Sequence, residues 1–305
     1  MTVKLIMLPK EPPMSWEDFI ERYSEYSIAI DGFVRGGPKQ DLERKLFNMN
    51  HHEEVDRAST DATCLQALNK VREGLMRKLL RDEHGPRATV LANDCDEDVC
   101  TTWTILHNAW LFEPAGNPKV NKLVEVESKL DKSAGAYPFH QDMPFLRELA
   151  WIYYPYTSFR VSGGLDRRDA KEFSQVVFLV EERILRYIAD KGETIDLDLG
   201  YKMVGGTKEL AIITEAGLHA RNGMVADGIE AYVMYRQRAD GSYTTTVGKF
   251  SSINPLDLEA AYVRLNNAEP DKSRRWGGGD MAGGSDRSKG TEIEPEDVRR
   301  ILLET

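Results

Sequence analysis

Hydrophobic positions in the N-terminal third of the chain alternate between short continuous runs and longer helical spacings. Short apolar runs at 27–30, 46–49 and 88–92 are bounded by polar residues or glycine, which predicts buried strands. Between and after them, 59–80 and 99–111 carry apolar side chains at the spacing of one helix face. This order of strand, loop and helix predicts a mainly parallel sheet with helices on both faces.

The pattern changes beyond this first domain, which we place at 1–130. The segment 131–193 contains helix-breaking residues and then an amphipathic helix over 169–191, so we predict a helical connector. From residue 194 to the end, shorter apolar runs and turn residues predict a smaller α+β domain over 194–305. The strands expected there are 209–214, 228–236 and 242–247, and the expected helices are 256–267 and 294–303.

The composition is ordinary, with 305 residues of which 41% are hydrophobic and 30% charged. The formal net charge of −10 repels long polyanions, so long nucleic acid is not an expected partner. No apolar run approaches the roughly 20 residues of a membrane span, and the N-terminus has no signal-peptide pattern. The three cysteines cannot all pair, and no CxxC motif occurs. We therefore expect a cytoplasmic protein with reduced thiols.

Polar residues that are able to bind a metal follow each predicted strand of the first domain. Asp31, the pair His51-His52 and Asp94 each come directly after a short apolar run. The carboxyl ends of parallel strands meet at one edge of a sheet, so these side chains are expected at a common rim. Imidazoles and carboxylates are ligands of divalent cations. The sequence therefore predicts a metal site at this rim.

The same features also have structural explanations. An adjacent histidine pair is more often a surface or capping pair, and Asp31 could belong to an ordinary turn. The acids Asp94, Asp96 and Asp98 could begin a helix, where the helix dipole favours negative charge. A calcium loop is excluded, because Val99 stands where that loop needs glycine. Repulsion among three close carboxylates is relieved by a cation, which favours the metal interpretation.

A glycine-rich segment with arginines lies near the end of the chain. Consecutive glycines can direct backbone N–H groups toward an anion, and the arginines add charge-assisted hydrogen bonds. A flexible linker is the alternative, but linkers seldom carry tryptophan and methionine among their glycines. We therefore predict that this segment binds a small anionic substrate. The candidate residues are Arg275, Gly278, Gly279, Gly283, Gly284, Ser285 and Arg287, with His219 in a separate polar loop.

These motifs resemble those of the DHH family of phosphoesterases, which is named after an Asp-His-His triplet. Residues 50–52 resemble that triplet, with Asn50 in the place of its aspartate, and 58–64 resemble the helix start rich in small and hydroxyl residues that follows it. Shorter similarities to the family's first acidic motif, a later acidic motif and the glycine-rich loop of its C-terminal domain occur at Asp31-Gly32, 94–98 and 275–285.

The resemblance implies a two-domain phosphoesterase with a manganese site in its N-terminal domain. We expect Mn²⁺, or another divalent metal, to activate water for attack on a small anionic substrate. The predicted metal ligands are Asp31, His51, Asp94 and Asp96, the predicted catalytic residues are His52 and Asp98, and the reserve candidates are Asp131, His140 and His219. The chain departs from the family pattern at Ala29 and Asn50, where acids are expected, which indicates one metal or a rearranged pair.

Two other functions fit the same residues. A metal hydrolase could act on an amide or imine on the same scaffold, because activated water attacks these groups as well. A non-catalytic nucleotide-binding protein is the other alternative, and the missing acids favour it. The aromatic segment 151–156 is explained equally well by a homodimer contact and by packing between domains.

Overall fold

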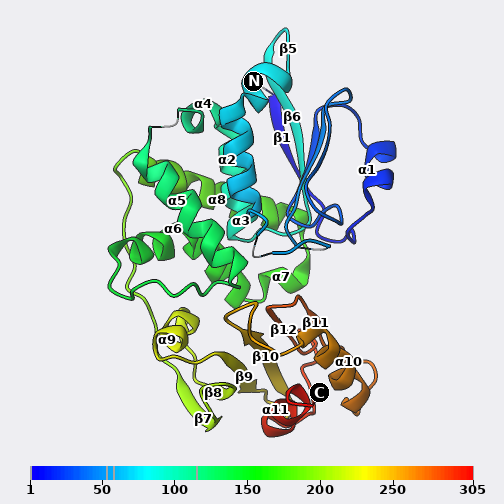
Figure 1. The fold of residues 1–305 in the computed structure, drawn as a ribbon, viewed down its shortest axis with the longest axis vertical. Coiled ribbons are helices and arrows are strands. Elements are labelled where there is room, and N and C mark those ends of the chain that lie inside the picture. The colour runs from blue at the N-terminus through cyan, green and yellow to red at the C-terminus, as the bar shows by residue number, and fades with distance from the viewer. Residues whose placement is uncertain (1, 53, 58, 115, 305) are drawn as a thin grey trace. The chain divides into compact units, whose positions relative to one another are not determined.

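The computed structural model describes residues 2–52, 54–57, 59–114 and 116–304. The chain forms two compact units (Figure 1). The first comprises Met1–Lys132 and Arg147–Ile195, and the second comprises Ser133–Leu146 and Asp196–Thr305. Most of the segment expected as a connector therefore belongs to the first unit. Each unit is built around its own sheet, so the chain has mixed α/β content.

A six-stranded, mostly parallel sheet organises the first unit. The strands pair in the order β1 (Thr2–Met7), β6 (Gly85–Ala92), β2 (Ser27–Ile30), β4 (Leu46–Met49) and β3 (Lys39–Asp41), with β5 (Arg81–Asp82) beside β6. The first four run parallel, whereas β3 and β5 pair antiparallel to their neighbours. The predicted strands at 27–30 and 46–49 are confirmed at both ends. β1 was missed, because most of its side chains are exposed or only partly buried, as in an edge strand.

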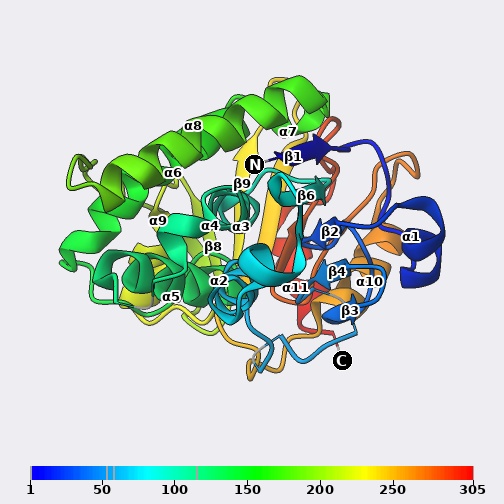
Figure 2. The same ribbon diagram turned by 90° about the horizontal axis from the view of Figure 1, so that it is seen from above.

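Helices cover both faces of this sheet, as the sequence predicted (Figures 1 and 2). On one face, Phe19 of α1 (Trp16–Arg22) packs into a buried cluster that includes Ala29 and Leu91 from the central strands. On the other face lie α2 (Thr63–Glu73) and α3 (Glu97–His107), which contact each other. Helix α2 also contacts strand β4, and helix α3 contacts strand β1. Helices therefore lie on both faces of the sheet, which explains why β2 and β4, in its interior, are buried at every position.

The helix predicted over 59–80 is wrong at its ends. α2 begins only at Thr63 and stops at Gly74, whose left-handed backbone (φ 103°) ends the helix. A short π-helix over Leu75–Leu79 follows it. The amphipathic helix near 169–191 is confirmed as α8 (Ala170–Ile188), whose N-cap Asp169 accepts hydrogen bonds from two backbone N–H groups at 2.9 Å. The other helices are α4 (Ala109–Phe112), α5 (Pro118–Lys132), α6 (Pro144–Val161) and α7 (Gly164–Arg167).

The second unit has a mainly antiparallel six-stranded sheet. Its strands pair in the order β11 (Gly277–Gly278), β12 (Ala282–Gly284), β10 (Tyr243–Lys249), β9 (Ala231–Gln237), β8 (Ala211–Thr214) and β7 (Lys202–Gly206). α10 (Leu258–Ala268) and α11 (Pro295–Leu302) share one hydrophobic cluster with it, and α9 (Ala220–Ala226) shares another. The strands and helices predicted for this part are confirmed to within a few residues.

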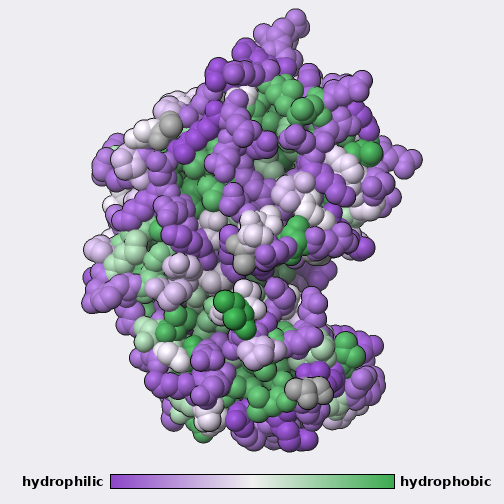
Figure 3. All heavy atoms as spheres, in the orientation of Figure 1, coloured by the Kyte–Doolittle hydropathy of each residue, from purple (hydrophilic) through white to green (hydrophobic). Residues whose placement is uncertain are grey.

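Hydrophilic residues cover most of the face seen in Figure 3, and hydrophobic residues form smaller patches on it. Among the described residues, no helix combines the length and apolar character that crossing a membrane requires. Cys64, Cys95 and Cys100 are all buried and form no disulfide.

Candidate metal centre

The neighbouring strands β2 and β4 end side by side and deliver Asp31 and His51 to the same place. Ile30 pairs with Met49 in parallel register, and the Asp31 N–H donates to the Met49 carbonyl at 2.9 Å. Asp31 has a positive φ of 49°, a conformation that aspartate tolerates better than most residues. The chain then turns at Gly32 (φ 77°). The predicted meeting of side chains at the strand ends is therefore observed for these two residues.

The imidazole of His51 is the centre of a compact Asp/His cluster. Its Nε2 atom lies 2.8 Å from a carboxylate oxygen of Asp131, and 3.6 Å from one of Asp31 and one of Asp98. The Nε2 atom of His52 lies 2.6 Å from the same Asp31 oxygen. Two overlapping groups of potential metal ligands result: Asp31 with both histidines, and His51 with Asp98 and Asp131.

The His51 side chain is fully buried, at 0% exposed, yet neither ring nitrogen has a hydrogen-bond partner of acceptable geometry among the described residues. An unpaired buried polar atom is costly, so its presence needs an explanation. Ligands that bind one ion at about 2.1 Å lie roughly 3 Å apart when they are adjacent. The separations around Nε2 are close to this value. The cluster is therefore able to hold a divalent metal ion.

Asp98 links this cluster to the start of helix α2. Its two carboxylate oxygens accept hydrogen bonds from the backbone N–H groups of Thr63 (2.7 Å) and Cys64 (2.6 Å). The N-cap position of α2 itself is Ala62, which has no capping side chain. Asp98, from the first turn of α3, therefore caps α2. Burial, together with the nearby Asp131 and Asp31 carboxylates, raises the pKa of Asp98 to about 6 against the opposing effect of His51.

Asp131 completes the cluster from the last turn of α5, where a carboxylate opposes the helix dipole. Arg57 offsets this charge, because its guanidinium donates to the Asp131 carbonyl at 3.0 Å and lies 3.3 Å from the carboxylate. Burial would raise the pKa of Asp131, but His51 and Arg57 outweigh burial and lower it. The sequence named Asp131 only as a reserve candidate. An acid at the unfavourable end of a helix was the available signal.

Asn50 stands where the DHH triplet has aspartate, and both polar atoms of its side chain form hydrogen bonds with backbone groups. Its Oδ1 accepts from the N–H groups of His51 (2.8 Å) and His52 (3.1 Å). Its Nδ2 donates to the carbonyls of Val34 (3.0 Å) and Gly36 (2.9 Å). The side chain is completely buried. Asn50 therefore fixes the turn that presents both histidines, a role that needs two donors as well as an acceptor.

The other predicted metal ligands, Asp94 and Asp96, lie outside both groups of potential ligands. An Asp94 oxygen accepts from the Cys95 N–H at 2.7 Å, and Asp96 is the N-cap of α3 through the Val99 N–H at 3.0 Å. Burial and the carboxylates of Asp31, Asp94 and Asp131 raise the pKa of Asp96 well above its usual value. The charges of the cluster therefore affect the pKa of Asp96, but its side chain serves to cap helix α3.

The glycine-rich segment in the second unit folds as the β11–β12 hairpin rather than as an open loop. A Cβ atom on Gly283 would lie 2.3 Å from the Tyr262 hydroxyl, so glycine is needed there for close packing. Trp276 and Met281, which favoured a binding loop, are buried core residues. The Ser285 hydroxyl accepts from the Thr245 N–H at 3.0 Å. Gly278 and Gly284 are paired within the sheet, and Gly279 directly follows β11. The side chains of Arg275 and Arg287 are exposed. In the separate polar loop, the Nδ1 of His219 accepts a hydrogen bond from the Asp198 N–H.

The affinity of the cluster for Mn²⁺ is expected to rise with pH. Burial lowers the pKa of His51, but the Asp131 and Asp31 carboxylates outweigh burial and raise it to about 10. In the metal-free protein His51 is therefore protonated near neutral pH, and a metal ion must displace that proton. The dissociation constant should fall about tenfold from pH 6 to pH 7. Calorimetric titration with Mn²⁺ at the two pH values measures this, and an affinity independent of pH would contradict it.

No protein-family model matches the chain, and comparison with curated protein sequences gave no match. The similarity to DHH phosphoesterases therefore rests on short sequence motifs.

Proposed function

We propose that the chain is a metal-dependent hydrolase whose divalent ion is held by His51, Asp98 and Asp131, one of the two groups of potential ligands; Asp31 belongs to the other group, with His51 and His52. The observation that carries this proposal is the buried Nε2 of His51, which lies within 3.6 Å of three carboxylates but has no hydrogen bond of acceptable geometry to any described residue. Mixed carboxylate and imidazole ligands suit Mn²⁺ among the available cations. Of the predicted metal ligands, the proposed set keeps His51, and it takes Asp98 and Asp131 in place of Asp94 and Asp96.

A divalent ion bound at this position supplies Lewis-acid chemistry and activates water for attack on an ester or amide. The side chain of His52 is 30% exposed and contacts Asp31 through Nε2, and its second ring nitrogen, Nδ1, is the proton donor in the proposed reaction. Burial lowers the pKa of His52, but the Asp31 carboxylate outweighs burial, so its pKa is raised. A protonated His52 near the metal is suited to give its proton to the leaving oxygen.

The proposed reaction is hydrolysis of a phosphoester, which follows from the similarity of the sequence motifs to those of DHH phosphoesterases. Chelator-treated protein should release nitrophenolate from bis(p-nitrophenyl) phosphate only after Mn²⁺ is added back. His52→Ala should lower kcat by about a hundredfold or more while Mn²⁺ still binds. His84→Ala is the matched control, because the His84 side chain is 83% exposed and remote from this cluster in its contacts. Its activity should equal that of the unmodified protein.

The outcomes also separate the alternatives. Turnover of p-nitrophenyl acetate without turnover of the phosphodiester would favour a hydrolase of another substrate class. Tight Mn²⁺ binding without turnover of either substrate would favour a non-catalytic binding protein. Neither result would weaken the assignment of the metal ligands, which depends on binding alone.

A further inference from the structure

The metal centre has a buried side and an exposed edge. The side chains of His51 and Asp98 are fully buried. Those of His52, Arg57 and Asp131 are 30%, 16% and 15% exposed, and they are the part of the centre that a molecule from solvent meets first. Arg57 differs from the other two because its guanidinium stays positively charged at any physiological pH. A permanently charged donor therefore lies beside the centre.

Most hydrogen-bond donors of the Arg57 guanidinium have no partner among the described residues. Within this part of the chain only Nη2 donates, to the Asp131 carbonyl at 3.0 Å and to its carboxylate at 3.3 and 3.5 Å. The two carboxylate contacts are long, since charge-assisted bonds of this kind usually measure about 2.7–2.9 Å. The Nε atom is buried and has no partner there. An unpaired buried donor is costly, and an oxygen of a bound anion would satisfy it.

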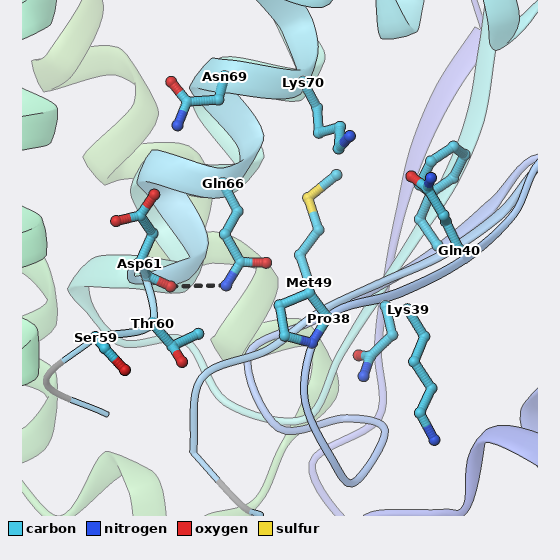
Figure 4. A pocket seen from close by; sticks show the side chains of 12 residues that line it. Pro38, Lys39, Gln40, Met49, Ser59, Thr60, Asp61, Gln66, Asn69 and Lys70 are labelled. Carbon is cyan, nitrogen blue, oxygen red and sulfur yellow. Dashed lines mark hydrogen bonds between the residues drawn. The ribbon is translucent and has the colours of Figure 1, made fainter. Parts of the chain in front are cut away.

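The loop that carries Arg57 is tied at both ends to one side chain of helix α2. Gln66 donates to the carbonyl of Asn50 at 3.1 Å and to the carbonyl of Asp61 at 2.7 Å. Asn50 directly precedes the two histidines, and Asp61 lies beyond Arg57 in the chain. Figure 4 shows the hydrogen bond to Asp61, at the wall of a neighbouring cavity. Because the ends of the loop are fixed before a ligand binds, less conformational entropy is lost on binding.

Arg57 shares the Asp131 carboxylate with His51. The Asp131 oxygen that lies 3.3 Å from Arg57 Nη2 also lies 2.8 Å from His51 Nε2. With a divalent ion bound by His51 and Asp131, the charge of this carboxylate would be neutralised, and its attraction for the guanidinium would weaken. The guanidinium would then be available to a second anion. Its planar fork matches the oxygens of a phosphoryl group, to which it can donate two parallel hydrogen bonds.

Arg57 also lies near His52, the proposed proton donor. Burial is the strongest influence on the pKa of His52 and lowers it, the Asp31 carboxylate raises it, and the positive charge of Arg57 lowers it. An anion bound by Arg57 would therefore lie close to the proton donor and to the metal ligand Asp131. A reacting phosphoryl group has to be held at such a place for the chemical step.

We propose that Arg57 binds the anionic oxygens of the substrate's phosphoryl group at the exposed edge of the metal centre. This role of Arg57 rests on the proposed function, because it specifies the substrate as a phosphate ester and places its charge beside His52. It is the role that the sequence had assigned to Arg275 and Arg287, which belong to the second unit.

Calorimetric titration of the full-length, Mn²⁺-loaded protein with inorganic phosphate tests this role. Arg57→Met keeps an unbranched stem and removes every donor, so phosphate affinity should fall about tenfold or more. Arg57→Lys keeps the charge without the planar fork, and its phosphate affinity should lie between those of the other two proteins. Arg57→Met should bind Mn²⁺ at least as tightly as the unmodified protein, because a positive charge beside Asp131 is removed. A purely structural arginine would not give this combination.

Arg87→Met is the control for these variants. The Arg87 side chain is 56% exposed near the amino end of β6, whereas the metal centre lies at the carboxyl ends of β2 and β4, which run parallel to β6. Arg87→Met should bind phosphate as the unmodified protein does. Equal phosphate affinities of Arg57→Met and Arg87→Met would overturn the assignment of Arg57. Absence of phosphate binding by the unmodified protein up to several millimolar, both with Mn²⁺ and after chelator treatment, would overturn it as well.

Failure of this assignment and failure of the proposed hydrolase function give different results. Metal-dependent turnover of bis(p-nitrophenyl) phosphate with an unchanged KM in Arg57→Met would leave the hydrolase function intact and overturn the role of Arg57. Absence of turnover, or of Mn²⁺ binding, would overturn the hydrolase function. The titration with phosphate after chelator treatment requires no turnover, and weaker binding by Arg57→Met than by Arg87→Met would still support the role of Arg57.

Discussion

Replacement of His51 by alanine is expected to weaken Mn²⁺ binding by more than about a hundredfold, because losses of tenfold to a hundredfold already follow from changes outside the direct ligands. His51 is the residue shared by both groups of potential ligands, and its Nε2 has no other partner in the described structure. Alanine removes this nitrogen and leaves Asp98 and Asp131 without a neighbouring imidazole, whereas Asp31 keeps His52. Isothermal titration of chelator-treated protein with Mn²⁺ measures the loss.

A second variant guards against a trivial loss of folding. His51→Gln keeps a polar side chain of similar length, and circular dichroism should show that it folds, while its Mn²⁺ affinity should fall nearly as far. His84→Ala again serves as the control and should bind Mn²⁺ normally. Unchanged Mn²⁺ affinity in both His51 variants would contradict the assignment of this cluster as the metal centre.

Replacement of Asn50 by aspartate is expected to destabilise the protein by about 2–5 kcal/mol. The family resemblance alone implies the opposite, since aspartate would restore the family triplet. However, the Asn50 Nδ2 donates to two buried carbonyls, which a carboxylate would repel. The backbone turn that carries His51 and His52 would lose its anchor. The midpoint of urea unfolding should fall accordingly, and Mn²⁺ affinity should not improve.

Asn69→Asp is the matched control for this change, because Asn69 is exposed on α2 and makes no side-chain hydrogen bond among the described residues. Its unfolding midpoint should stay within the usual range of surface substitutions, about 0.5 kcal/mol. If Asn50→Asp is as stable as the unmodified protein and binds Mn²⁺ more tightly, Asn50 occupies a ligand position. The hydrogen bonds of the Asn50 side chain would then contribute little to stability, and the position would correspond to the metal-binding aspartate of the DHH triplet.

The sequence alone could locate part of this centre for a physical reason. Asp31 and His51 each follow a short apolar strand, and parallel strands of a doubly covered sheet deliver their carboxyl ends to one edge. Asp98 was found as part of an acidic cluster, although its capping of α2 was not. That capping depends on Ala62, a residue without a capping side chain, and on the packing of α3 against α2. Such contacts between helices leave no periodic signal in a single sequence.

Asp131 as a member of the cluster and the fold of the glycine-rich segment could not be predicted from the sequence pattern. Asp131 lies at the end of a helix about 80 residues after His51, and only the packing of α5 brings the two together. The glycines near residue 280 predicted an open loop, because sequence cannot distinguish backbone freedom from the close packing that the Tyr262 hydroxyl imposes on Gly283. Burial of Trp276 and Met281 is likewise a property of the second core. Long-range packing therefore decided each of these positions.

Anomalous diffraction at the manganese edge, from crystals of the protein grown with Mn²⁺, tests the metal centre most directly. A peak is expected within bonding distance of His51 Nε2 and of carboxylate oxygens from Asp31, Asp98 or Asp131. A peak at Asp94 and Asp96 with none at His51, or no ordered peak in a protein that retains Mn²⁺ in solution, would contradict the assignment.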